Sequence, residues 1–201
     1  MTSKKMIAAL ICGMAGCLCF GGGDWLMIYG DVSGADNAFA MLTNGAAQIE
    51  MWRYDLAMAV SFPGIILYGI ALFSVQNYIT DGKNKRIYHY LNAFGLTPWI
   101  ALHLFYIMIL ALFGWLCNNG YEFNEAQAIC TELYSALSWV VIVSEGLMLP
   151  VFLYWFWLQI TGKTAFPKVF AFTNVLLIFA VLKGVSMLIP EGAFQLAFRN
   201  G

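Results

Sequence analysis

Residues 132–160 read ELYSALSWVVIVSEGLMLPVFLYWFWLQI, an apolar run in which Glu145 is the only charged residue after Glu132. A transmembrane helix needs about 20 mostly apolar residues, and this run is longer than that. Runs of similar character lie at 6–28, 54–79, 95–117 and 168–189. Strands of a membrane β-barrel would alternate in polarity over about ten residues, whereas these runs are continuous. The pattern predicts an all-α, polytopic membrane bundle of five transmembrane helices that forms one domain over residues 1–201.

The composition of the chain excludes several other classes of protein. Of the 201 residues, 61% are hydrophobic and 10% are charged, whereas soluble domains have about 45–50% and about 25%. Ten Lys and Arg residues against eleven Asp and Glu residues give a net charge of −1, which provides no electrostatic basis for binding nucleic acid. The five cysteines show neither CxxC spacing nor a Cys/His cluster, so we predict no metal site and no cofactor. Membrane lipids are the expected partners.

Basic residues are divided unequally between the two sides that five crossings would define. Seven of the ten lie on the side of the N-terminus: Lys4, Lys5, Lys83, Lys85, Arg86, Lys163 and Lys168. The opposite side has Arg53 and Arg199, with the acidic residues Asp31, Asp36, Glu50, Asp55, Glu122, Glu125, Glu132 and Glu191. Because cytoplasmic loops are rich in Lys and Arg, the pattern predicts a multi-pass protein of the cell inner membrane. Its N-terminus would be inside and its C-terminus outside.

The first apolar run admits two interpretations. Lys4 and Lys5 before it, and the stretch from Met14 to Cys17, resemble a cleaved lipoprotein signal. The residues after Cys17 remain apolar, however, which favours a retained helix. Small residues four apart, at Ala8, Cys12 and Gly16, would allow close packing on a neighbouring helix. The glycines at 21–23 predict a kink, or a close approach by another backbone or a ligand.

Ionisable residues inside a membrane usually face the bundle interior and mark functional sites. With a rise of 1.5 Å per residue, Glu145, His103 and Tyr68 lie ~20 Å below the outer ends of their helices, near one layer. A carboxyl group and an imidazole in that layer could exchange a proton with an apolar molecule, and a phenol could stabilise a developing oxyanion. The alternative is that these groups only form hydrogen bonds between helices.

Four further residues are predicted to contribute to the site or to its framework. Asp24 and Lys183 lie ~8–10 Å from the outer side, where they would form a structural salt bridge or a charged vestibule for a polar head group. Asn174 would satisfy a free backbone group or line the cavity, and Trp139 is a candidate ligand contact. At the outer side, Cys117 and Cys130 would either form a disulfide or remain two free thiols.

Short motifs resemble those of an uncharacterised bacterial family of small multi-pass membrane proteins. They are the turn GKTAFPK at 162–168 and the stretches at 172–174 and 188–190 that follow it, Gly23-Asp24, FPGIILYG at 62–69 and the region of His103. In that family a GKTxFP[RK] turn opens a helix that contains an Asn and ends in Pro-x-Gly. The resemblance implies the topology and the choice of residues, but no activity. A fainter likeness at the level of the fold is to small sterol-isomerase-type bundles with intramembrane His and Glu.

The residues favour a membrane protein that binds an apolar or amphipathic small molecule in a cavity centred on Glu145 and His103, in a proton-coupled binding or transport role. Two alternatives stay open. The first is a membrane-embedded acid–base enzyme, of isomerase type, acting on a lipid or sterol-like substrate. The second is a structural or assembly subunit without a ligand. The sequence decides neither the identity of the ligand nor the oligomeric state.

Overall fold

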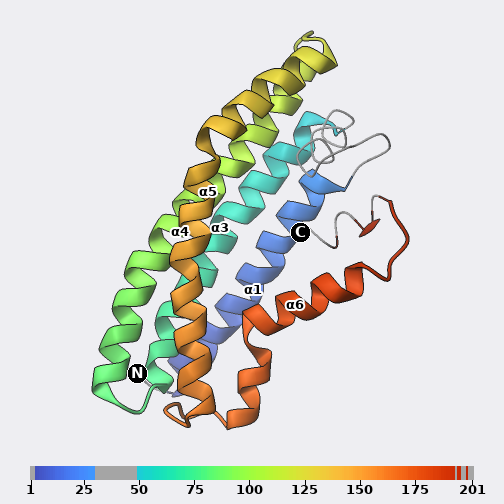
Figure 1. The fold of residues 1–201 in the computed structure, drawn as a ribbon. Coiled ribbons are helices and arrows are strands. Elements are labelled where there is room, and N and C mark those ends of the chain that lie inside the picture. The colour runs from blue at the N-terminus through green and yellow to red at the C-terminus, as the bar shows by residue number, and fades with distance from the viewer. Residues whose placement is uncertain (1–2, 30–48, 193, 196–197, 199–201) are drawn as a thin grey trace.

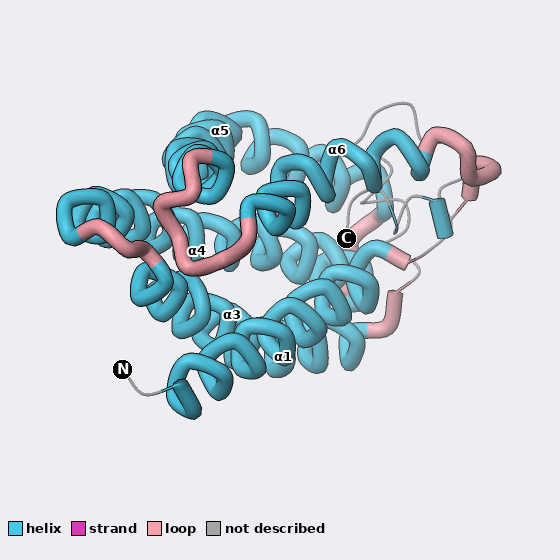
Figure 2. Tube along the Cα trace, turned by 90° about the horizontal axis from the view of Figure 1, so that it is seen from below, coloured by secondary structure: helices cyan, strands magenta, loops and turns pink. Residues whose placement is uncertain are grey.

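The computed structural model describes residues 3–29, 49–192, 194–195 and 198. These residues form α1 (Ser3–Ile28), α3 (Met51–Val75), η1 (Gln76–Tyr78), α4 (Gly82–Asn118), α5 (Phe123–Ile160), η2 (Lys168–Thr173) and α6 (Val175–Ser186). Figure 1 shows α1, α3, α4 and α5 as long rods lying side by side, with α6 oblique to them. Seen from the end that carries the N-terminus, the loop after α5 crosses the end of the bundle (Figure 2).

Four helices of the described chain are long and apolar enough to cross a membrane: Lys4–Met27, Met51–Tyr78, Gly82–Asn118 and Phe123–Ile160. The predicted fifth span, 168–189, is corrected by the structure. It is divided into the short 3-10 helix η2 and the helix α6, which has 12 residues. Such a helix is ~18 Å long, whereas the hydrocarbon core is about 30 Å thick. The predicted topology, with the N-terminus inside and the C-terminus outside, stays a prediction, because these helices do not establish five crossings.

The break in the fifth segment has a local cause. Pro167 is the residue before η2, and Asn174 is the N-cap of α6, with its side chain accepting a hydrogen bond from the N–H of Leu176 at 3.0 Å. Asn is a favoured N-cap because its side chain satisfies one of the unpaired N–H groups of the first turn. A polar cap inside an apolar run therefore begins a new helix and does not continue the old one.

The helices α4 and α5 are longer than the predicted spans. They begin at Gly82 and Phe123, whereas the sequence pattern predicts starts at 95 and 132. Asp81 caps α4, because its side chain accepts a hydrogen bond from the N–H of Lys83 at 2.9 Å. At 37 and 38 residues, each helix is ~55 Å long. The hairpin therefore extends past the ends of α1 and α3, as Figure 1 shows.

The helices α1 and α3 pack through small residues. A Cβ added at Gly16 would lie 2.6 Å from the main-chain oxygen of Gly64, and one added at Gly23 would overlap the hydroxyl of Ser61. The close packing predicted for the first span is therefore present, although Gly16 is its only predicted member that is buried, while Ala8 is exposed. Gly23 shows the predicted close approach of a neighbouring helix, and α1 remains one continuous helix.

We call the two ends of the bundle the basic end and the acidic end. The basic end carries the starts of α1, α4 and η2 and the loops 79–81 and 161–167. The lysines there are Lys4, Lys5, Lys83, Lys163 and Lys168. These two loops are joined, because the N–H of Thr80 donates to the oxygen of Lys163 at 3.1 Å and the N–H of Ala165 donates to Tyr78 at 2.7 Å. The acidic end carries the start of α3 and the loop 119–122.

Candidate functional site

The predicted deep layer contains an aromatic cluster from three helices. Tyr68 on α3 is half-buried, and the centroid of its ring lies 6.4 Å from that of Trp99 on α4. The ring of Trp99 in turn lies 5.9 Å from that of Phe20 on α1. Tyr68 is therefore placed between the two hairpins, at the level of Trp99.

The side chains of His103 and Glu145 lie outside the described residues, so their predicted contact stays a prediction. Their backbone positions can still be compared. A Cβ added at Gly95 would lie 2.5 Å from the main-chain oxygen of Leu147, which places position 145 near the level of residue 97 on the antiparallel α4. Position 145 and Tyr68 are therefore level to within about a turn, and position 103 lies ~9 Å nearer the acidic end.

The predicted salt bridge between Asp24 and Lys183 is not found among the described residues. Asp24 is only 8% exposed, and it follows Gly23 on the turn of α1 that packs against α3. Lys183 lies on α6, where its Nζ is 5.1 Å from the centroid of the Phe179 ring. Because α6 is oblique to α1 and is not a fifth span, the depths assigned to these two residues from the sequence do not bring them together.

Asn174 and Trp139 do not line one cavity in the described part of the chain. The side chain of Asn174 is buried, donates a hydrogen bond to the oxygen of Phe152 at 3.1 Å and caps α6. It thus satisfies backbone groups, one of the two roles predicted for it. Trp139 is 62% exposed on α5, so its indole lies on the outer surface of the helix.

All five cysteines are free thiols, so the disulfide between Cys117 and Cys130 is not formed. Cys130 is fully buried, and its Sγ lies 3.9 Å from the main-chain oxygen of Ile109, to which it donates. The second interpretation, two free thiols, is the one the structure shows.

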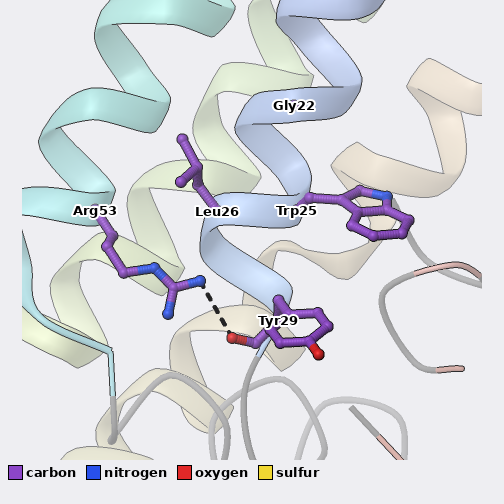
Figure 3. Close-up of a pocket in the computed structure, with 5 residues that line it drawn as sticks. All are labelled: Gly22, Trp25, Leu26, Tyr29 and Arg53. Carbon is purple, nitrogen blue, oxygen red and sulfur yellow. Dashed lines mark hydrogen bonds between the residues drawn. The ribbon is translucent and has the colours of Figure 1, made fainter. Parts of the chain in front are cut away.

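A pocket of about 360 Å³ lies at the acidic end of α1, and we call it the rim pocket. It is lined by Gly22, Trp25, Leu26, Tyr29 and Arg53. Figure 3 shows the first four on α1, with Leu26 directed toward α3 and Trp25 directed away from it, whereas Arg53 reaches in from α3. The spacing of three or four residues places the α1 members on one helix face. The rings of Trp25 and Tyr29 are stacked, with centroids 6.4 Å apart.

Arg53 gives the rim pocket its charge. Its Nη2 donates a hydrogen bond to the main-chain oxygen of Tyr29 at 3.2 Å, as the dashed line in Figure 3 marks. A guanidinium has five N–H donors, so this bond leaves most of them available. Within the described residues no carboxylate forms an ion pair with Arg53, and the nearby Glu50 accepts from the indole N–H of Trp52. The rim pocket therefore combines an apolar, aromatic wall with a cation.

A segment close to the C-terminus lies against the same part of α1. The ring of Phe194 packs edge-on against Trp25, with centroids 5.7 Å apart. The neighbouring Gln195 donates from Nε2 to the main-chain oxygen of Ser186, at the end of α6, at 3.2 Å. The segment after α6 therefore reaches the acidic end and contacts one wall of the rim pocket.

The rim pocket was not predicted from the sequence, apart from the suggestion that a ligand could approach the glycines at 21–23. Its strongest sequence signal is Arg53, a basic residue on an otherwise acidic side, close to the start of an apolar run. That signal becomes a site only when α3 packs antiparallel to α1, because Arg53 and Tyr29 are far apart in the sequence.

A comparison with known families finds a match over residues 1–201 to a family model described as "Family of unknown function (DUF6796)". The chain belongs to this family. Neither a curated protein nor a solved structure matches the chain significantly. The expectation of an uncharacterised family is confirmed by this match, whereas the bacterial origin and the GKTxFP[RK] turn that we associated with it stay predictions. Family membership assigns no reaction, so the function must be argued from the site itself.

Proposed function

We propose that this protein is a membrane protein that binds an anionic amphiphilic small molecule in the rim pocket. The observation that carries the proposal is the guanidinium of Arg53 beside the apolar wall made by Trp25, Leu26 and Tyr29. Arg pairs with carboxylate and phosphate through parallel hydrogen bonds, and Trp and Tyr are favoured where one end of a group is apolar and the other is wet. The pocket has a volume of about 360 Å³ and is wide open, so it would cover the anionic group and the adjoining part of an amphiphile and leave the rest of its chain outside.

The proposed location follows from charge. The seven basic residues near the basic end favour a cytoplasmic position for that end in the cell inner membrane. The rim pocket would then lie at the opposite interface, where the charged group of an amphiphile meets its hydrocarbon part. A ligand held there would have its anionic group on Arg53 and its chain along α1.

Native mass spectrometry and extraction of bound lipid test this proposal on the purified full chain. The wild type should retain an anionic amphiphile, and Arg53→Gln should lose most of it. The control is Arg86→Gln, which removes the same charge from an exposed position at the basic end. Equal retention by all three proteins, or retention of neutral molecules only, would contradict the proposal.

A second candidate function is acid–base chemistry, or proton-coupled transport, at Glu145, His103 and Tyr68. It is favoured by the common level of position 145 and Tyr68, with Trp99 between the hairpins. Here Glu145→Gln should alter turnover or proton uptake while leaving the amphiphile bound, whereas Arg53→Gln should release it. A structural or assembly subunit would instead give ligand-free spectra for the wild type and for both variants.

A further inference from the structure

The loop after α5 and the start of η2 carry two lysines, Lys163 and Lys168, at the basic end. Gly162 turns the chain with a φ of +69°, a conformation that glycine adopts without strain. A Cβ added there would lie 3.1 Å from Cε and 3.9 Å from Nζ of Lys168. The next residue, Lys163, has its Nζ 3.9 Å from the centroid of the Trp157 ring. The amine of Lys168 thus lies against the turn at Gly162, and the amine of Lys163, the next residue, lies over an indole that is 37% exposed.

The charge of these amines is not neutralised by the residues around them. Asp81 is the one acidic residue that the sequence places at the basic end, against seven basic residues. Its carboxylate accepts from the N–H of Lys83 at 2.9 Å and from Nδ2 of Asn84 at 2.5 Å. In the described part of the chain, no carboxylate forms an ion pair with Lys163 or Lys168. This end is therefore a cationic surface that lacks its counter-ion.

The turn that carries the amines is held in place by the neighbouring loop. Both the N–H and the hydroxyl of Thr80 donate to the main-chain oxygen of Lys163 at 3.1 Å. Phe166, two residues before Lys168, packs its ring 4.4 Å from that of Tyr78. A site whose backbone is fixed before binding loses less conformational entropy when a ligand arrives.

Exposed apolar side chains lie next to the cationic turn. Ile160 at the end of α5 is 44% exposed, and Val169 and Phe172 on η2 are 66% and 74% exposed. A soluble anion would leave these apolar side chains exposed to water, whereas the acyl chains of a phospholipid would cover them. Amines, an indole and apolar side chains are the groups that contact the headgroup, glycerol and chain regions of a lipid.

We infer that Lys163 and Lys168 bind the phosphate of an anionic phospholipid at the basic end, with its glycerol region against Trp157. This site is separate from the rim pocket, since it lies at the other end of the bundle and uses different helices. Its ligand is part of the bilayer, whereas the molecule proposed for the rim pocket is retained on purification.

The test compares lipid affinity in nanodiscs. The full chain is reconstituted in phosphatidylcholine, and phosphatidylglycerol binding is titrated by native mass spectrometry. The double variant Lys163→Gln/Lys168→Gln should weaken that binding at least tenfold. The control Lys83→Gln/Arg86→Gln, which removes two charges from exposed residues at the same end, should change it less than twofold. Trp157→Leu should weaken it by an intermediate factor.

Three outcomes would overturn the inference. Equal losses in both double variants would show diffuse attraction to the basic end and no site. Displacement of the lipid by millimolar inorganic phosphate would identify a soluble anion as the ligand. Retention of phosphatidylglycerol by all variants would exclude the two amines. None of these outcomes bears on Arg53, because the rim-pocket ligand is measured separately in the Arg53→Gln protein.

Discussion

The guanidinium of Arg53 on α3 donates a hydrogen bond to the main-chain oxygen of Tyr29, 3.2 Å away at the end of α1. The last carbonyl groups of a helix lack partners inside the helix and carry a partial negative charge. A cation is therefore favourable there even without a ligand. The bond also joins α3 to the end of α1 at the edge of the rim pocket, so the position of the guanidinium depends on the packing of α1 against α3.

Replacing Arg53 with Lys separates charge from geometry. The ammonium group keeps the charge but lacks the planar set of donors, so it cannot bond Tyr29 and a carboxylate or phosphate side by side. We expect the affinity for the anionic amphiphile to fall by about tenfold, which corresponds to about 1.4 kcal/mol, and to fall further in Arg53→Gln. Equilibrium binding in detergent compares the affinities of the wild type, Arg53→Lys and Arg53→Gln. Equal affinity of the Lys and Gln variants would contradict a role for the charge.

The packing of α1 on α3 is tested by a pair of glycine substitutions. Gly16→Ala places a Cβ 2.6 Å from the backbone of α3, so the helices must separate. We expect a loss of about 1–3 kcal/mol in the free energy of unfolding. Gly21→Ala meets no atom within 4 Å and should be neutral or stabilising by up to about 1 kcal/mol, because Ala is the better helix former. Denaturant titration in micelles compares the two variants. The packing account would be wrong if Gly21→Ala were the more damaging change.

The capping role of Asn174 predicts that Asn174→Ala and Asn174→Asp differ in the stability of the first turn of α6. Asn174→Ala removes both the cap of α6 and the donor to Phe152, and loss of a cap costs about 1 kcal/mol. Asn174→Asp keeps the acceptor for the N–H of Leu176, but it loses the donor and places a carboxylate oxygen beside the main-chain oxygen of Phe152. Hydrogen–deuterium exchange should therefore speed up at the first turn of α6 in the Ala variant and change little in the Asp variant. Equal exchange rates in both would show that the cap does not set the start of α6.

Much of the fold follows from the sequence, because apolar runs bounded by turn residues identify long membrane helices. The four long helices were predicted in this way. The fifth span failed because composition does not reveal that Asn174 turns its side chain onto the backbone and begins a new helix. The starts of α4 and α5 were placed too late, because helical hydrogen bonding continues outside the apolar runs, where Asp81 provides the cap.

The candidate site was predicted less well than the fold. Glu145, His103 and Tyr68 were placed in one layer by depth along their own helices. The register of the backbone puts position 145 and Tyr68 within about a turn of each other and position 103 ~9 Å nearer the acidic end. Asp24 and Lys183 were paired by depth along two predicted spans, whereas Lys183 lies on the oblique helix α6. The rim pocket needs Arg53 to reach Tyr29 from another helix, and that contact depends on tertiary packing. The residue pattern of one helix does not predict a contact between two helices.

Topology is tested by single-cysteine labelling in a background without the five native cysteines. With four crossings and a cytoplasmic basic end, Lys83→Cys should react with a membrane-impermeant maleimide only after the membrane is opened. Asn119→Cys, in the loop between α4 and α5, should react in intact cells. Reaction of both positions from the same side would contradict the crossing of α4.

The most direct test of the account is photo-crosslinking with an anionic amphiphile that carries a diazirine next to its charged group. The account predicts that the adduct lies on the face of α1 formed by Trp25, Leu26 and Tyr29, and that Arg53→Gln removes it. Ile11 and Leu18 on the same helix, which are 59% and 77% exposed, should stay unlabelled by a probe anchored at the rim. Adducts spread along α1 without regard to Arg53 would mean ordinary contact with lipid, and the proposal that the rim pocket binds a ligand would be wrong.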